Sequence, residues 1–499
     1  VLNIVSLKKN IIISYAAQIY VSAVGILILP LYIKYMGAES YGLIGFFTML
    51  QALFGLLDLG LTPTIGRETA RYHGGTMTVL DYRKLLRTLH ILFFTIATIG
   101  GVFLFFLAPI ISVHWLKVTT ISIDTVNYCV KIMAFSIALR WIGGLYRGII
   151  SGSERLDWLS YLNIFITTLR FIIIFPVMKV KGYTPFVFFT YQLIVAIIEY
   201  LSLLCLSTLL TPKLKSANEK IGFSFSPIMS LMRFSLTVAF TSSIWILITQ
   251  SDKLILSGIL ELSEYGHFTL SVLLASGILM INIPVTNSIL PRLARLHAEN
   301  KHDELLRIYK NTTMLVCILG VSASLVVAIY AEPLLLIWTG DAEVSASASP
   351  ILSLYAIGNG LLAVSAFPYY LQYAQGRLKY HFWGNIVMFF MLIPTIIVLA
   401  RNFGGVGAGY AWLIVNVFYL FVWTALVHHK LIPGLHLSWL MSIGMITIPT
   451  GIIVFFLSFI VRFSGNRLHD IIVLGLISIL ALMVSIVSCW LIKRMNLGV

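Results

Sequence analysis

Apolar residues run along the chain in long blocks, from one end to the other, and short polar segments separate them. A helix needs roughly 20 mostly apolar residues to cross the hydrocarbon core of a bilayer. The pattern therefore predicts an all-α polytopic membrane protein with about 14 transmembrane helices, of which the second and the tenth are interrupted. We expect these helices near residues 11–33, 41–61, 90–112, 125–149, 158–178, 185–209, 234–258, 266–290, 312–338, 350–371, 381–400, 404–427, 438–461 and 470–492.

The composition agrees with this pattern. Hydrophobic residues make up 59% of the 499 residues and charged residues only 11%, and the mean hydropathy is +0.96. A soluble protein cannot hide so much apolar surface, because its exterior must meet water. The alternating pattern of a membrane β-barrel is absent from the sequence.

The basic residues are distributed unevenly between the predicted loops. The net charge is 34 − 19 = +15, which could indicate a nucleic-acid partner. Membrane topology explains the charge better, and we expect no nucleic-acid partner. With the amino terminus inside, 22 Lys and Arg residues fall in cytoplasmic segments and 8 in outer loops. The positive-inside rule then places both termini in the cytoplasm.

The chain contains an internal repeat with a shift of 224 residues. In this register Tyr41-Gly42 falls on Tyr265-Gly266, and the order of the predicted helices also matches. Each half has six helices, so the two repeats are predicted to be parallel. We therefore expect an N-lobe at residues 1–210, a cytoplasmic linker at 211–227, a C-lobe at 228–432 and two additional helices at 433–499.

Several kinds of chemistry have no motif in this sequence. It contains no GxxxxGK[ST] phosphate loop, no HExxH and no GxSxG, and the longest predicted outer loop has about a dozen residues. The four cysteines lie in apolar blocks without a CxxC spacing, so we expect buried thiols and no metal site. No cofactor is predicted, and a transporter is favoured over a membrane enzyme.

Several short motifs resemble those of the polysaccharide flippase family. This family includes the O-antigen flippases and belongs to the multidrug/oligosaccharidyl-lipid/polysaccharide exporter superfamily. The similar stretches are MGAESYGLIGFF from Met36, LDLGLTPTIGRETAR from Leu57, GSER from Gly152, QSDKLILSGIL from Gln250 and AQGRLK from Ala374. The two C-terminal helices resemble instead the lipid II flippases, whose dense row of arginines is absent here.

The resemblance implies a function. An oligosaccharide linked to undecaprenyl pyrophosphate would be moved from the cytoplasmic to the outer leaflet by two rocking lobes, in O-antigen or capsule-like polysaccharide biosynthesis. It also implies the bacterial cytoplasmic (inner) membrane, possible coupling to H⁺ or Na⁺ and a possible polysaccharide polymerase as partner.

Arg140, Arg170 and Glu199 are predicted to lie deep in the first lobe, where charge is costly without a cavity or a partner, and Arg147 is predicted nearer the cytoplasmic end of its helix. Arg140 and Arg147 are seven residues apart and share one helix face, so they could guide a pyrophosphate. Alternatively, Arg140 forms a structural ion pair and Arg147 reaches the membrane surface. Arg170 and Glu199 could simply pair, or Arg170 could bind substrate while Glu199 couples transport to protons.

Three further charges lie near predicted helix ends. Asp252 and Lys253 point about 100° apart on a helix, so they need not pair. These two residues could form a lock at an outer gate, form a cation site, or be ordinary charges at the membrane interface. Asp58 could be a hydrogen-bond partner at a helix end or an inner gate with Arg67 or Arg71.

Two other functions compete with the flippase. A cation-coupled multidrug exporter of the same superfamily would favour an acidic site in the first helix, but residues 11–33 contain no carboxylate. A membrane glycosyltransferase or polymerase would need a larger outer loop to hold its acceptor.

The topology can be tested with reporter fusions. We expect fusions within residues 67–87 and near Arg307 to report a cytoplasmic location, because these loops carry the densest positive charge. Fusions there that are active only outside the membrane would contradict the orientation and the helix count.

Overall fold

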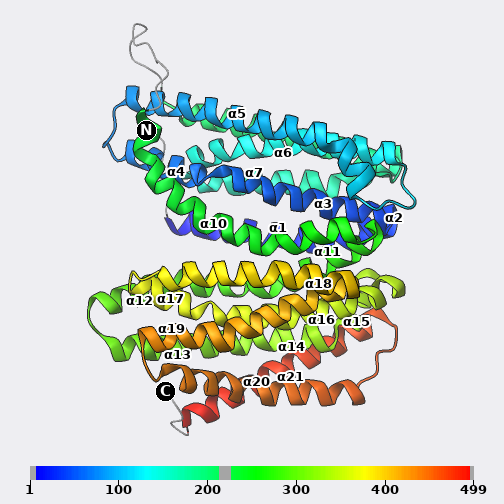
Figure 1. Ribbon diagram of the computed structural model, residues 1–499, viewed down its shortest axis with the longest axis vertical. Coiled ribbons are helices and arrows are strands. Elements are labelled where there is room, and N and C mark those ends of the chain that lie inside the picture. The colour runs from blue at the N-terminus through cyan, green and yellow to red at the C-terminus, as the bar shows by residue number, and fades with distance from the viewer. Residues whose placement is uncertain (1–6, 213–225, 495–499) are drawn as a thin grey trace. The chain divides into compact units, whose positions relative to one another are not determined.

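The computed structural model describes residues 7–212 and 226–494, and over these ranges it is helical throughout, with no strand. The chain divides into two compact units, Val1–Gly266 and His267–Val499. Within each unit the helices run side by side along a common direction (Figure 1). The predicted all-α class is therefore confirmed.

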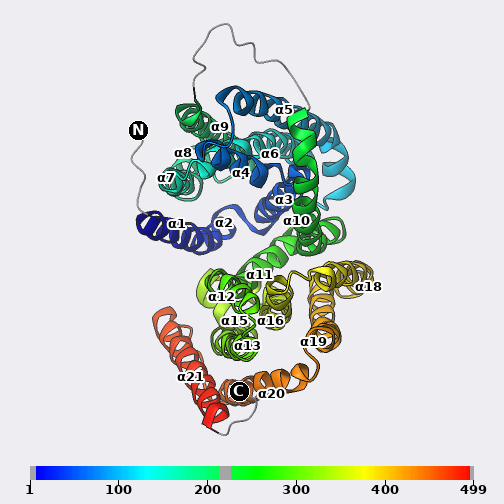
Figure 2. The same ribbon diagram turned by 90° about the vertical axis from the view of Figure 1, so that its left-hand side faces the viewer.

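The first unit is built around α6, which packs against α4, α5 and α9 (Figure 2). Helices α1 and α7 pack against each other beside this group. The elements are α1 (Leu7–Leu27), α2 (Leu29–Met36), α3 (Ala38–Phe54), the 3₁₀ turn η1 (Gly55–Asp58), α4 (Leu61–His73), α5 (Val79–Ile110), the π-helical η2 (Ile111–Trp115), α6 (Ile123–Gly152), α7 (Leu156–Thr167), the π-helical η3 (Thr168–Ile173), α8 (Ile174–Lys181), α9 (Pro185–Leu210) and α10 (Ser226–Ile259).

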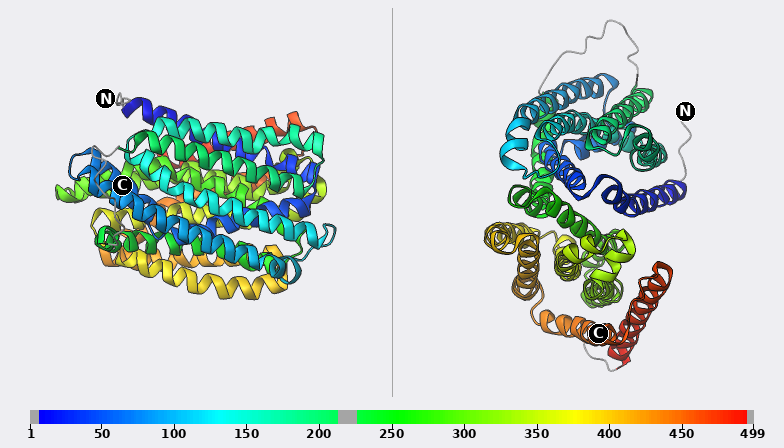
Figure 3. Two further views of the ribbon diagram at one scale, coloured as in Figure 1. Left: turned by 90° about the horizontal axis from the view of Figure 1, so that it is seen from above. Right: turned by 90° about the vertical axis from the view of Figure 1, so that its right-hand side faces the viewer.

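The second unit packs α16 against α14, α15 and α18, and the final pair α20 and α21 lies along its edge (Figure 3). Its elements are α11 (Leu262–Met280), which begins in the first unit, α12 (Asn282–Ala298), α13 (His302–Val316), the π-helical η4 (Cys317–Val321), α14 (Ser322–Ile329), α15 (Ala331–Thr339), α16 (Ala342–Ser365), α17 (Phe367–Ala374), α18 (Lys379–Phe418), the π-helical η5 (Tyr419–Trp423), α19 (Thr424–Leu431), α20 (Leu435–Ile460) and α21 (Arg467–Arg494).

All the predicted membrane-crossing segments are helical. In the described parts of the chain, 11 helical stretches are long and apolar enough to cross a membrane. One of them, Lys379–Leu431, has 53 residues and turns at Gly404, whose φ of 56° and ψ of −137° are not helical, so it holds two predicted helices. The predicted helices at 234–258 and 266–290 lie in α10 and in α11 with α12. The chain is a multi-pass membrane protein.

The second predicted helix is interrupted as expected, and the interruption has a local cause. Leu59 and Gly60 adopt left-handed backbone angles between η1 and α4, with φ of 46° and 70°. Asp58 then accepts hydrogen bonds from the backbone N–H of Thr62 at 3.2 Å and from its hydroxyl at 2.5 Å. Asp58 therefore caps the start of α4, which is the helix-end role predicted for it.

The predicted lobe boundaries differ from the division into compact units. The predicted C-lobe begins at residue 228, within the first turn of α10, whereas α10 packs against α3 and is counted with the first unit. Most of the predicted linker, 211–227, lies outside the described residues. The lobe boundaries therefore stay a prediction.

Large apolar side chains cover the outer faces of several helices. Phe106 of α5 and Phe459 of α20 are each 71% exposed, and Val180 of α8 is 80% exposed. Water would not tolerate so many exposed apolar groups, whereas lipid solvates them. These faces are therefore the ones that meet the hydrocarbon.

The two Tyr-Gly pairs of the predicted repeat lie against each other within the first unit. A Cβ on Gly42 would clash with the carbonyl oxygen of Leu262, and a Cβ on Gly266 would lie 2.6 Å from that of Ala38. In the 224-residue register Ala38 corresponds to Leu262 and Gly42 corresponds to Gly266, so the two contacts are reciprocal.

The close approach of α3 and α11 predicts that Gly42→Ala destabilises the protein. Overpacking of this kind costs about 1–3 kcal/mol, because backbone atoms must move. Thermal unfolding of the purified protein in detergent should show a lowered midpoint. Gly25→Ala is the matched control, because no atom lies within 4 Å of the added Cβ. Equal midpoints for the two variants would show that this contact is not tight.

Candidate functional site

Two pairs of polar residues connect helices α6 and α9. Arg140 donates to the side-chain oxygen of Gln192 at 3.1 Å, and Arg147 donates to Glu199 at 2.6 Å. Both pairs have an offset of 52 residues, so the two helices run in the same direction. Residues seven apart lie on one helix face, which brings both contacts to the same interface.

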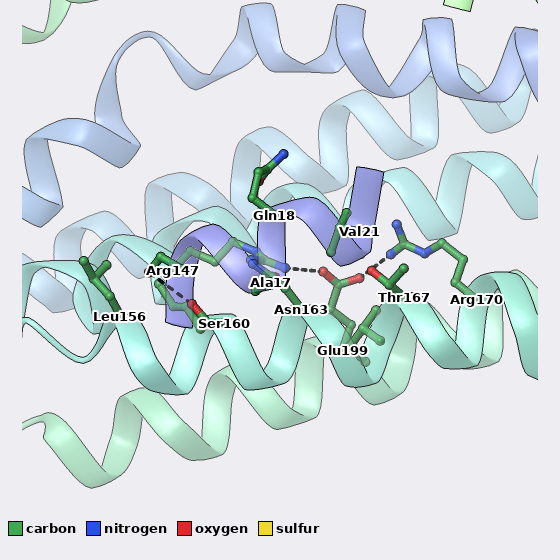
Figure 4. A pocket seen from close by; sticks show the side chains of 13 residues that line it. Ala17, Gln18, Val21, Arg147, Leu156, Ser160, Asn163, Thr167, Arg170 and Glu199 are labelled. Atoms are coloured by element: carbon green, nitrogen blue, oxygen red, sulfur yellow. Dashed lines mark hydrogen bonds and ion pairs between the residues drawn. The ribbon is translucent and has the colours of Figure 1, made fainter. Parts of the chain in front are cut away.

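Glu199 lies between two arginines. Its Oε1 is 2.6 Å from Nη2 of Arg147, and its Oε2 is 2.7 Å from Nη2 of Arg170 (Figure 4). The side chain of Glu199 is only 9% exposed, whereas those of Arg147 and Arg170 are 32% and 21% exposed. A buried carboxylate must be paired, and here each of its oxygens has its own cation.

The backbone that carries Arg170 is a π-helical segment, η3. Side chains of the neighbouring helix α9 donate hydrogen bonds to carbonyl groups of this segment. Tyr191 donates to the carbonyl of Leu169 at 3.0 Å, and Gln192 donates to that of Arg170 at 3.1 Å. Side chains of α9 thus hold the segment that places Arg170 beside Glu199.

Arg147, Arg170 and Glu199 line a cavity of about 390 Å³ inside the first unit. Among the described residues that line it they are the only charged ones, so this part of the lining carries a net charge of 2 − 1 = +1. The other lining side chains are hydroxyl, amide and apolar groups. Helix α1 contributes Ser14, Ala17, Gln18 and Val21, and helix α7 contributes Leu156, Leu159, Ser160, Asn163, Ile166 and Thr167.

Arg140 does not line this cavity. Its Nη1 donates to Gln51 at 2.7 Å, and its guanidinium lies over the ring of Phe47, 5.0 Å from the centroid. Gln192 connects it to the cavity indirectly, because the same amide accepts from Arg140 and donates to the carbonyl of Arg170. The predicted stripe of Arg140 and Arg147 thus contacts α9 at two positions along the helix, and only Arg147 lines the cavity.

The remaining predicted residues lie elsewhere in the first unit. Asp252 is 3% exposed on α10, and its Oδ1 is 3.9 Å from Nζ of Lys253. Lys253 also donates to the carbonyl of Thr249 at 2.9 Å, so it is held along its own helix. Neither residue lines the cavity, and neither does Asp58, which caps α4.

Sequence reasoning missed the uncharged members of the site. Asn163 accepts from Nη1 of Arg147 at 2.8 Å, and Ser14 shares a hydrogen bond with Ser160 at 3.2 Å. Gln192 could have been found, because it precedes Glu199 by seven residues as Arg140 precedes Arg147. The described residues contain no cluster of metal-ligating side chains.

The bridging role of Gln192 predicts that Gln192→Leu destabilises the protein. The change removes the partner of a guanidinium N–H of Arg140 in a buried place, because Gln192 is 2% exposed. It also removes one donor to the carbonyl of Arg170, which still accepts from the hydroxyl of Tyr32 at 3.5 Å. The expected cost is about 1–3 kcal/mol, measured by thermal or denaturant unfolding. Gln18→Leu is the control, because Gln18 is exposed and makes only a 3.4 Å contact with Ser22. A similar loss in both variants would contradict a bridging role.

Solved structures of membrane transporters share this fold at low sequence identity. A lipid II flippase MurJ in an inward closed conformation matches at 12% identity, covering 98% of this chain and 100% of that chain with a TM-score of 0.72. An inward-facing multidrug resistance MATE family transporter of the MOP superfamily matches at 12% identity, covering 83% and 94% with a TM-score of 0.69. A MOP superfamily transporter from Pyrococcus furiosus, described by the reverse polarity of its binding pocket, matches at 13% identity, covering 85% and 96% with a TM-score of 0.53.

Comparison with sequence families gives the same picture. No curated protein sequence matches the chain. The lipid II flippase MurJ family matches residues 263–481, and the polysaccharide biosynthesis protein family matches residues 7–297, more than half of the chain and all of the cavity. The chain belongs to the polysaccharide biosynthesis protein family, a membership that the motifs beginning at Met36 and Leu57 had indicated.

Proposed function

We propose that this protein is a flippase for an oligosaccharide linked to undecaprenyl pyrophosphate. It moves this substrate from the cytoplasmic to the outer leaflet by alternating access, in O-antigen or capsule-like polysaccharide biosynthesis. The observation that carries the proposal is the cavity of the first unit, where two guanidinium groups meet one carboxylate at 2.6 and 2.7 Å.

The chemistry of the cavity suits a pyrophosphate. A pyrophosphate cannot enter hydrocarbon unless cations compensate its charge. Guanidinium groups do this well, because their planar N–H groups match phosphate oxygens in pairs. Arg147 and Arg170 would bind the phosphates, while the hydroxyl and amide groups of Ser14, Gln18 and Asn163 would bind sugar hydroxyls.

The comparisons support the same class of substrate. The matching family is that of polysaccharide biosynthesis proteins, and the flippase that shares the fold along its whole length is described as a lipid II flippase. We infer a bacterial cytoplasmic membrane protein with both termini in the cytoplasm. A polysaccharide polymerase would take over the flipped product.

The alternative of a cation-coupled multidrug exporter fits less well. A cavity that binds organic cations needs a net negative lining, whereas this one has a net charge of +1. The first helix contributes Ser14 and Gln18 to it and no carboxylate. A membrane glycosyltransferase or polymerase has no support from the family matches.

Coupling to H⁺ or Na⁺ remains part of the proposal. Glu199 is the carboxylate that would respond to substrate, because it contacts both arginines. Asp252 and Lys253 on α10 and Asp58 at the start of α4 are proposed gating residues, away from the cavity.

Removal of the cavity cations should stop export. We expect Arg170→Ala to reduce surface glycan at least tenfold at near-normal protein level, and Arg170→Lys to be partly active, because charge remains but the planar donor pair is lost. Arg140→Ala should also abolish export, through lost support of the Arg170 segment. Surface glycan and protein level can be measured by blotting of cells that carry each variant.

Two comparisons decide the outcome. Arg295→Ala is the control, because Arg295 is 66% exposed, pairs with the exposed Glu299 and does not line the cavity. If Arg170 only compensates Glu199, the double change of both residues to Ala should restore export. Full export by Arg170→Ala alone would contradict substrate binding at this site.

A further inference from the structure

The two arginines of the cavity have more donors than Glu199 uses. Each guanidinium carries five N–H donors. Arg170 makes one hydrogen bond to Glu199, and its buried Nε has no hydrogen-bond partner. Arg147 makes one to Glu199 and one to Asn163. Both cations can therefore bind a ligand with more acceptor oxygens than a single carboxylate.

The charges in the cavity are also unequal. Glu199 supplies one negative charge to two positive ones, whereas a lipid-linked pyrophosphate carries about two at neutral pH. Its oxygens are spread over two phosphates, so each phosphate can face one guanidinium. A pyrophosphate therefore matches the pair of arginines better than the carboxylate that contacts them.

The cations are more accessible than the anion. The side chains of Arg147 and Arg170 are 32% and 21% exposed, whereas that of Glu199 is 9% exposed. Figure 4 shows Glu199 pointing from its helix toward both guanidinium groups, with residues of α1 across the cavity. A ligand that enters the cavity meets the arginines while Glu199 stays behind them.

We propose that Glu199 is a displaceable internal counter-anion that competes with the phosphates of the substrate for Arg147 and Arg170. The proposal rests on the proposed function, because it concerns the same cavity. Before substrate binds, Glu199 keeps two charges paired that would be costly inside the membrane. When substrate leaves, Glu199 takes its place again. The carboxylate thus weakens binding so that release is possible.

Competition predicts that the loss of the carboxylate strengthens binding. We would measure the affinity of the purified, full-length protein in lipid nanodiscs for inorganic pyrophosphate, by calorimetry at fixed ionic strength. Glu199→Gln should bind at least tenfold more tightly than the natural protein, because the amide is uncharged and similar in shape. The same variant should export less surface glycan in cells, because release slows.

The controls separate this competition from other effects. Glu68→Gln also removes a buried carboxylate that pairs with an arginine, but Glu68 does not line the cavity. It should leave the affinity unchanged. Arg170→Gln should weaken binding at least tenfold, and Arg170→Gln combined with Glu199→Gln should lose most of the gain. Glu199→Asp keeps the charge but is one methylene shorter, so it can contact only one arginine well and should bind with intermediate affinity.

The failures of the two proposals are distinguishable. If Arg170→Gln weakens binding but neither Glu199→Gln nor Glu199→Asp strengthens it, Glu199 does not compete with substrate and the further inference is wrong. If Arg147→Gln and Arg170→Gln bind pyrophosphate and export glycan as the natural protein does, the proposed function of the cavity is wrong. If Glu199→Gln does not fold, Glu199→Asp alone decides, and an unchanged affinity in that variant overturns the competition.

Discussion

One buried carboxylate shared by two arginines is the interaction on which the rest of the first unit depends. Glu199 lies on α9, Arg147 on α6 and Arg170 on η3, so three separate segments of the chain meet at one anion. Charges are tolerated inside a membrane only where they are paired or reach water. The packing of these helices must therefore keep three side chains within hydrogen-bond distance of one another, and it leaves a cavity beside them.

The surrounding polar contacts are consequences of that requirement. Helices α6 and α9 run in the same direction, and their paired residues are 52 positions apart in sequence. The pair of Arg140 and Gln192 therefore lies about two helical turns away from the pair of Arg147 and Glu199. In the irregular η3 segment, the carbonyl groups of Leu169 and Arg170 accept hydrogen bonds from Tyr191 and Gln192 of α9. Hydrogen bonds without competition from water are strong, and unpaired polar groups there are costly. The site is thus held by a connected network rather than by isolated pairs.

Much of this could be predicted from sequence, and the limits have physical reasons. Hydropathy located the helices, because a lipid-spanning segment must be apolar along its length. It also marked Arg140, Arg170 and Glu199, since deep charges are rare, and helical spacing added Arg147 on the face of Arg140. Sequence spacing suggested one stripe of Arg140 with Arg147, but it could not show that only Arg147 reaches the cavity.

The partner of Arg170 was weighed correctly as Glu199, whereas the second partner of Glu199 was not foreseen. Arg147 and Glu199 lie on the regular helices α6 and α9, and their pairing depends on how these two helices pack, which the spacing along a single helix does not reveal. The uncharged residues Asn163 and Gln192 were missed because amides occur in many apolar helices without a role. Their importance follows only from what they contact.

The charge of the cavity limits what the protein can carry. A lining with two arginines and no carboxylate would leave uncompensated cations in a low-dielectric interior whenever the cavity is empty. A lining with two carboxylates would repel a phosphate. Two cations with one anion avoid both problems, since the site is mostly neutralised at rest and still attracts a more highly charged ligand. For the proposed flippase, a net charge of +1 would therefore allow both stability in the membrane and exchange of an anionic substrate.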